Sequence, residues 1–378
     1  GYAVLQHYGH DFLDLMEPLV GKRASSTLGN PLFTGAIILM TIPISLAAAT
    51  ATIKEPVRTA GFWWKQGLWS LVLTVQLMGI IFTLGRGPWF GTILAVAGFL
   101  GVVGAFVGWR TLARAALVLV LACALTAALI LSIPEGKGAT STASTIEAVG
   151  GRFTALSSQG GIAGLGNRIE VWKGSGQLMT RHPWFEFDSL SLSPLRPLIG
   201  YGPELFRSAY LLESPPIGER ILPHEVAHGH NYFVHQGVEL GILGLLACLG
   251  VFVALFLVGG YQLFRSGRRY SNIHKVVLIG LLATLAGKLL EEMAGVARVS
   301  DLTLIWVLLA VFLALPTTMQ APQPVPVPDP APQPLRRPSP SRPSRRPHPI
   351  PAARSHPDQW QWAGRLALVV LLVAGIGS

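Results

Sequence analysis

A histidine next to a membrane-length apolar segment is the residue of this chain best placed to do chemistry. His230 and Asn231 are followed by nine residues and then by Gly241-Ile-Leu-Gly244-Leu245, inside an apolar run from Leu240 to Gly260. Histidine has an unperturbed pKa of about 6.5, so it exchanges protons readily at neutral pH. At the mouth of a membrane helix it can do so with water while it faces a substrate held in lipid. We therefore expect a base for proton transfer at this position.

The composition around this histidine is that of a multi-pass membrane protein. Hydrophobic residues make up 51% of the 378 residues and charged residues only 13%, against roughly 25% charged residues in soluble domains. The mean hydropathy is +0.49. We expect an all-α fold, a polytopic transmembrane helix bundle with one long extracytoplasmic loop that contains short helices. Runs that approach the ~20 residues of a spanning helix lie at about 33–51, 67–84, 89–108, 113–133, 236–260, 276–290, 302–316 and 362–377.

Basic residues in alternate loops predict the orientation of these spans. Cytoplasmic loops carry an excess of Lys and Arg, and here the basic loops are those after the first, third, fifth and seventh spans. The expected organisation is an extracytoplasmic segment 1–32 with earlier helices missing, four spans in 33–133, an extracytoplasmic catalytic loop 134–235, three spans in 236–316, a Pro/Arg-rich cytoplasmic linker 317–360 and a C-terminal, truncated span 361–378.

Short motifs follow one another through the predicted outer segments. In chain order they are Ser25-Ser-Thr-Leu-Gly29-Asn30-Pro31, Gly85-Arg86-Gly87-Pro-Trp89, Asn167-Arg168, His182-Pro183, Gly200-Tyr201-Gly202-Pro203 with Phe206 and Arg207, and His228-Gly-His230-Asn231. As an ordered set they resemble the bacterial O-antigen ligase and O-antigen polymerase family, over residues 1 to about 315. Two features depart from the family pattern: Trp172 stands where many ligases have leucine, and the stretch 186–198 looks like an insertion.

The resemblance implies a membrane glycosyltransferase that moves a glycan from undecaprenyl diphosphate to the hydroxyl of a lipid or protein acceptor, at the outer face of the bacterial plasma membrane. It implies His230 as general base, with Arg168 and Arg86 on the diphosphate. Histidine suits proton transfer, and arginine presents a planar, always charged fork to phosphate. We expect no metal and no cofactor. The substrate-binding residues that we expect are Arg207, His228, Asn231 and Tyr201. Ligases, polymerases and protein O-glycosyltransferases share these motifs.

Structural alternatives exist for several of these charged residues. Arg86 is as well explained as an interfacial anchor at a helix end, and Arg168 as a partner of Glu170 or Glu204 in the loop. His182 fits a turn, while His224 and His235 fit solvated or supporting positions. Lys288 and Glu292 are four residues apart, a spacing that predicts a local ion pair.

Two other classes of protein compete with the glycosyltransferase hypothesis. His224-Glu225-Val-Ala-His228 matches the zinc-protease pattern of two histidines one helical turn apart with a glutamate base between them. However, Pro223 and Gly229 bracket it and leave barely one turn of helix. A transporter or non-enzymatic membrane subunit would have ionisable residues near the bilayer midplane and interrupted helices. Here the polar groups gather at one outer face.

The remaining features indicate partners only in general terms. The net charge is +10, and six arginines of the segment 318–360 contribute much of it. No aromatic residues interleave with these arginines, so we expect membrane lipids rather than nucleic acid as their partner. The prolines favour an extended linker. Cys123 and Cys248 both lie in apolar runs and are expected to be small buried hydrophobic residues.

Overall fold

The computed structural model describes residues 1–10, 12–13, 23–54, 56–132, 142–154, 159–184, 195–213, 226–265 and 270–318. These parts of the chain contain helices and no strand. The helices are α1 (Tyr2–His7), a 3-10 turn (Ser26–Leu28), α2 (Pro31–Thr52), α3 (Ala60–Phe82), α4 (Arg86–Phe106), α5 (Trp109–Ser132), α6 (Thr142–Thr154), α7 (Gln159–Arg181), α8 (Arg196–Ile199), α9 (Phe206–Tyr210), α10 (Tyr232–Arg265), α11 (Asn272–Glu292) and α12 (Val299–Thr318).

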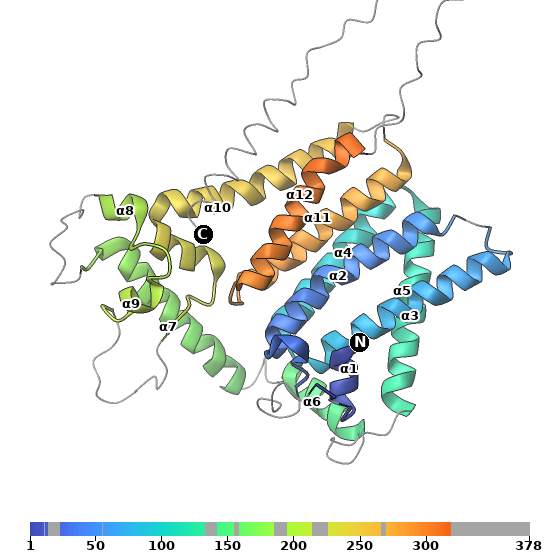
Figure 1. The fold of residues 1–378 in the computed structure, drawn as a ribbon, viewed down its shortest axis with the longest axis horizontal. Helices are drawn as coiled ribbons and strands as arrows, with labels where there is room; N and C mark the ends of the chain where they lie inside the picture. The colour runs from blue at the N-terminus through green and yellow to red at the C-terminus, as the bar shows by residue number, and fades with distance from the viewer. Residues whose placement is uncertain are drawn as a thin grey trace, which may run out of the picture.

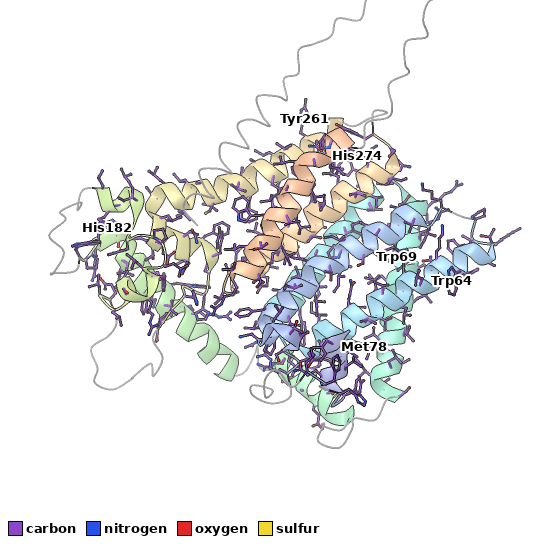
Figure 2. The ribbon with its side chains drawn as sticks, viewed as in Figure 1. Trp64, Trp69, Met78, His182, Tyr261 and His274 are labelled. Atoms are coloured by element: carbon purple, nitrogen blue, oxygen red, sulfur yellow. The ribbon has the colours of Figure 1, made fainter. Side chains whose placement is uncertain are left out.

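Seven of these helices, α2 to α5 and α10 to α12, are long and apolar enough to cross a membrane. They confirm the first seven predicted spans, and the eighth, at 362–377, lies outside the described residues. Helices α2 and α3 begin before their predicted apolar runs, and the polar side chains of Asn30 and Thr59 cap them. Helix α3 starts at Ala60 rather than at 67, since the Thr59 hydroxyl accepts a hydrogen bond from the Phe62 N–H (3.3 Å). Its first turns carry the exposed Trp63 and Trp64, of which Figure 2 labels Trp64. Tryptophans are enriched at membrane interfaces.

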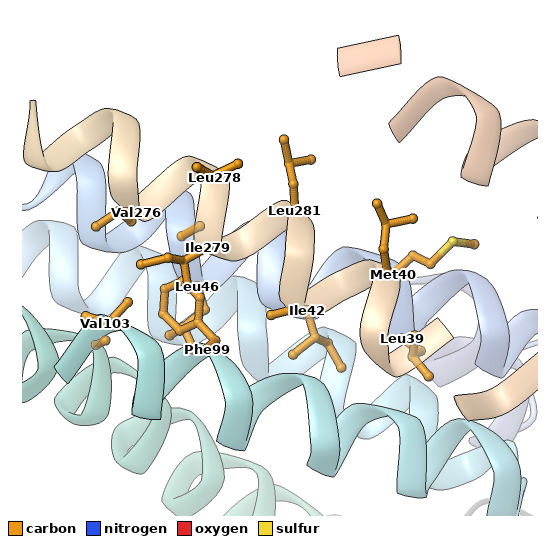
Figure 3. Close-up of a cluster of buried hydrophobic side chains, with 14 of the residues drawn as sticks. Leu39, Met40, Ile42, Leu46, Phe99, Val103, Val276, Leu278, Ile279 and Leu281 are labelled. Atoms are coloured by element: carbon orange, nitrogen blue, oxygen red, sulfur yellow. The ribbon is translucent and has the colours of Figure 1, made fainter. Parts of the chain in front are cut away.

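Helices α2, α4 and α11 form the tightly packed centre of the bundle (Figure 3). Leu39, Leu46 and Phe99 are among the side chains fully buried between them. The backbones of α4 and α11 approach closely at Gly91 and Gly287: a Cβ added to Gly91 would lie 2.6 Å from the Gly287 carbonyl oxygen. Small residues permit such close crossings of membrane helices. This crossing brings the start of α4 to the same end of the bundle as the end of α11.

Helix α10 is broken at Gly241, whose φ of 64° is not helical. A Cβ at Gly241 would lie 2.5 Å from the Leu198 carbonyl carbon, so α8 packs directly against the break. A residue with a side chain would be strained there both by its φ and by this contact. Asn231 caps the helix and α10 begins at Tyr232, so its first turn precedes the apolar run predicted from 236.

The described helices that are not candidate spans lie toward one end of the bundle. Helices α7, α8 and α9 lie beside the start of α10, while α1 and α6 lie near the end of α3 (Figure 1). Helix α7 has 23 residues, longer than the short helices expected in this loop. One of its glycines serves packing: a Cβ on Gly174 would lie 2.9 Å from the ring of Tyr210 in α9.

The two cysteines differ in their surroundings. Cys248 is buried, as predicted, and its sulfur lies 3.6 Å from the Tyr232 hydroxyl. The prediction that Cys123 is buried is wrong, since it is exposed on the surface of α5. A helix formed by a continuous apolar run is hydrophobic on all sides, so the sequence alone does not distinguish its lipid-facing side from its packed side.

Candidate active site

Arg86, Arg168 and His230, which are far apart in the sequence, lie close together at one end of the bundle. They come from the first turn of α4, the middle of α7 and the residue two before α10. Burial lowers the pKa of Arg168 below its usual value, and the nearby charge of Arg86 lowers it further, while Glu291 acts in the opposite direction. Burial and the charge of Arg168 likewise lower the pKa of His230. The imidazole is therefore neutral at physiological pH and free to accept a proton.

His230 has a φ of 47°, in the left-handed region that residues with a Cβ rarely adopt. This conformation costs roughly 1–2 kcal/mol, so the neighbouring contacts must hold it. Both backbone groups of the adjacent Gly229 are fixed: its N–H donates to His235 Nδ1 (3.3 Å) and its carbonyl accepts from Trp172 Nε1 (2.9 Å). The segment 228–230 is thus clamped between α7 and α10. Strained residues held in this way are typical of functional sites.

His235 and Glu239 support this clamp from the first turns of α10. Because His235 Nδ1 accepts the Gly229 N–H, the ring proton is on Nε2, which lies 3.4 Å from Glu239 Oε1. The same carboxylate oxygen accepts the backbone N–H of Phe206 in α9 (3.1 Å). Of the two roles expected for His235, the structure favours the supporting one. Glu239 was not predicted from the sequence, although its i,i+4 spacing from His235 is a recognisable signal.

The side chain of Asn231 ties α10 to α11. Its Oδ1 accepts the N–H groups of Phe233 (3.0 Å) and Val234 (3.2 Å), which makes it the cap of α10. Its Nδ2 donates to the carbonyl of Met293 (3.1 Å), just beyond the end of α11. This placement favours a structural role for Asn231 over the predicted contact with substrate.

Beneath the arginines, one buried lysine holds three carboxylates. Lys288 Nζ lies 2.5 Å from Glu291, 2.7 Å from Glu292 and 3.4 Å from Asp301. The predicted Lys288–Glu292 pair is confirmed, and the other two acids join it. The backbone of the Arg86 turn is also close, since a Cβ on Gly87 would lie 3.6 Å from Glu291 Cγ. Glu291 therefore links the lysine cluster to Arg168, and neither Glu170 nor Glu204 provides the opposing charge.

His228 lies close to His235, with the two ring centroids 5.6 Å apart. Burial, together with the charges of Arg298, His235 and His230, lowers the pKa of His228 to about 4 despite the opposing effect of Glu239. Arg298, just before α12, is thus a further cation at this end that the sequence analysis did not identify. His228 is neutral at physiological pH.

Tyr201 and Arg207, two predicted substrate-binding residues, are placed differently. Tyr201 is buried: its hydroxyl donates to the carbonyl of Pro183 (2.7 Å) and its ring stacks on Trp184. Burial and the charge of Glu213 raise the pKa of Tyr201 to about 12. Arg207 is exposed on α9, whose Phe206 stacks on His235 at 4.7 Å. Tyr201 therefore serves to fix the His182-Pro183 turn.

Within the described ranges, no group of three or more His, Cys, Asp or Glu side chains is arranged to hold a metal ion. His224 and Glu225 of the zinc-protease pattern lie outside those ranges. Fold and site together define a multi-pass helical protein with an arginine and histidine cluster at one end of its spans. No protein-family model, curated protein or solved structure matches the chain.

Proposed function

We propose that this protein is a membrane glycosyltransferase of the O-antigen ligase type, which moves a glycan from undecaprenyl diphosphate to an acceptor hydroxyl. The observation that carries the proposal is the convergence of Arg86, Arg168 and a neutral His230. Two guanidinium groups held close together repel each other and are partly desolvated, so a bound anion relieves both costs. A diphosphate offers the charge and the number of acceptor oxygens that this pair can satisfy.

In the proposed reaction, His230 takes the proton of the acceptor hydroxyl as the hydroxyl oxygen attacks the anomeric carbon of the glycan. The bond between that carbon and the diphosphate oxygen breaks, and its electron pair leaves with the diphosphate. Attack from the face opposite the leaving group inverts the anomeric configuration. Arg86 and Arg168 stabilise the negative charge that grows on the leaving group. The positive charge of Arg168 also favours the return of the proton from His230 to water.

The surrounding contacts suit this division of roles. Glu291 is buried and partly offsets the charge of Arg168. The Trp172 and His235 bonds to Gly229 hold the base in its strained conformation. The position of these groups at the ends of apolar helices fits a donor whose headgroup lies at the bilayer surface. The basic loops at the other end of the spans support an extracytoplasmic position for this site, and the proposed donor corresponds to the bacterial plasma membrane.

A transfer assay with purified protein tests the proposal. A labelled glycan on polyprenyl diphosphate is the donor, and lipid, saccharide and protein hydroxyls are offered as acceptors, so that the product identifies a ligase, a polymerase or a protein glycosyltransferase. Arg86→Gln and Arg168→Gln are each expected to lose most of the transfer and of the release of polyprenyl diphosphate. Arg110→Gln, an exposed arginine at the start of α5, serves as control. Equal rates in all three variants would refute the assignment.

A further inference from the structure

The short helix α8 presents apolar side chains outward although it does not belong to any span. Leu195, Leu198 and Ile199 are all exposed, with 42% of the Leu198 surface accessible. The neighbouring part of α10 carries Leu243 and Leu246, which are also exposed. These five side chains form the α8–α10 surface. Figure 1 shows α8 beside α10 at the end of the bundle where α7 and α9 are also found.

The break at Gly241 indicates the depth of this surface. Beyond the break, residues 242–264 form a helix of about 35 Å, close to the ~30 Å hydrocarbon thickness of a bilayer. The break therefore lies near the boundary between lipid and headgroups, and the first turns of α10 lie outside it. The backbone of Leu198 packs against Gly241, so α8 is at this same level. Its apolar side chains continue the lipid-facing surface of the span.

A cavity behind α8 adds charge complementarity. It has a volume of about 80 Å³. Met179 and Leu245 contribute apolar side chains to its lining, and His182 and Arg196 contribute basic ones. The Arg196 guanidinium lies 3.4 Å from the ring centroid of Trp184, and its NH1 donates to the Gly200 carbonyl (3.4 Å). Tryptophan and arginine together are the residues expected at the level of lipid phosphates. His182 is labelled at this end of the molecule in Figure 2.

We propose that the α8–α10 surface is an interfacial membrane anchor. Leu195, Leu198 and Ile199 lie among the upper carbons of the lipid chains, and Arg196 lies beside the phosphate of an anionic phospholipid. Leu243 and Leu246 continue this surface deeper along the span. The anchor holds the 195–213 segment, and with it α9, at a fixed height above the bilayer. This inference concerns the bilayer as partner and stands independently of the glycan-transfer proposal.

Depth measurements with a fluorescent probe test the anchor. Cys123 and Cys248 are the only cysteines, so a variant with both replaced by alanine accepts a single new cysteine bearing an environment-sensitive dye. The probe is placed at Leu198→Cys, with Leu246→Cys as the lipid control and Ser208→Cys on exposed α9 as the water control. Each protein is reconstituted in phosphatidylglycerol and phosphatidylethanolamine vesicles that contain lipids spin-labelled at a shallow or a deep chain carbon.

The Leu198 probe is expected to emit at a shorter wavelength than the Ser208 probe and to be quenched most by the shallow spin label. The Leu246 probe is expected to be quenched most by the deep spin label. In a second set of vesicles phosphatidylcholine replaces phosphatidylglycerol, and Arg196→Gln should reduce the gain in shallow quenching that phosphatidylglycerol gives over this neutral lipid. Emission and quenching equal to those of the Ser208 probe would overturn the anchor. A blue-shifted Leu198 probe that neither label quenches would also overturn it, because the surface would then be covered by protein. Quenching of the Leu246 probe confirms that the labelled protein is inserted.

Discussion

The hydrogen bond from Trp172 to Gly229 offers a quantitative test of how the base is held. In the variant Trp172→Phe the aromatic ring remains, but the Nε1–H that donates to the Gly229 carbonyl at 2.9 Å is lost. A neutral hydrogen bond contributes about 0.5–1.5 kcal/mol, and a buried carbonyl left unpaired costs about 1–3 kcal/mol. These values are comparable with the roughly 1–2 kcal/mol of strain at the left-handed His230. Without the bond, the strain is no longer fully opposed.

A loss of about 1 kcal/mol corresponds to about a fivefold decrease in rate. We therefore expect Trp172→Phe to lower glycan transfer about fivefold at saturating donor, with little change in the donor concentration for half-maximal rate. Trp69→Phe is the matched control: Trp69 also donates through Nε1 at 2.9 Å, to the Thr52 hydroxyl, and lies at the other end of the bundle (Figure 2). Wild-type rates in Trp172→Phe, or an equal decrease in Trp69→Phe, would refute the clamp.

Three further results are expected. The transfer rate should fall on acidification with a midpoint below pH 6.5, because burial and Arg168 lower the pKa of His230 and only the neutral ring accepts a proton. Arg168→Gln should raise this midpoint. A wild-type midpoint above pH 6.5 would contradict the assignment. Lys288→Met leaves three buried carboxylates without their cation and should lower the free energy of unfolding by about 3–5 kcal/mol. Thermal unfolding in detergent measures this loss. An unchanged unfolding midpoint would exclude a structural role for Lys288. Gly241→Ala should destabilise the protein by at least ~1 kcal/mol because Gly241 has a positive φ. Gly250→Ala is the control, because a Cβ at Gly250 meets open space and should leave the stability unchanged. Similar unfolding midpoints for the two variants would mean that the break in α10 is not required for stability.

The spans could be predicted from the sequence because hydropathy is a local property. Each of the first seven apolar runs corresponds to a helix, and the Lys288–Glu292 pair follows from its spacing. Asp301, which also contacts Lys288, could not be found in this way because it lies in the next helix. The break at Gly241 was equally out of reach, since it depends on contact with Leu198. Position within an apolar run does not reveal which distant segment packs against it.

The candidate site was predicted in part. The ordered motifs led to Arg86, Arg168 and His230, which the fold places together. Trp172 was regarded only as a departure from the family pattern, although its indole holds the segment that carries the base. The role of Asn231 was assigned to substrate, whereas its amide bonds to the backbone of α10 and to Met293. Residue types indicate the available chemistry, but only the three-dimensional contacts distinguish a reacting group from its support.

The most direct test of the central claim compares two histidine variants in the glycan-transfer assay. His230→Gln removes the proposed base, and His274→Gln replaces a buried histidine near the start of α11, at the opposite end of the bundle (Figure 2). Removal of a general base costs about 100-fold or more in rate. The account predicts a loss of this size in His230→Gln alone, with His274→Gln close to wild type. Full transfer activity in His230→Gln would contradict it.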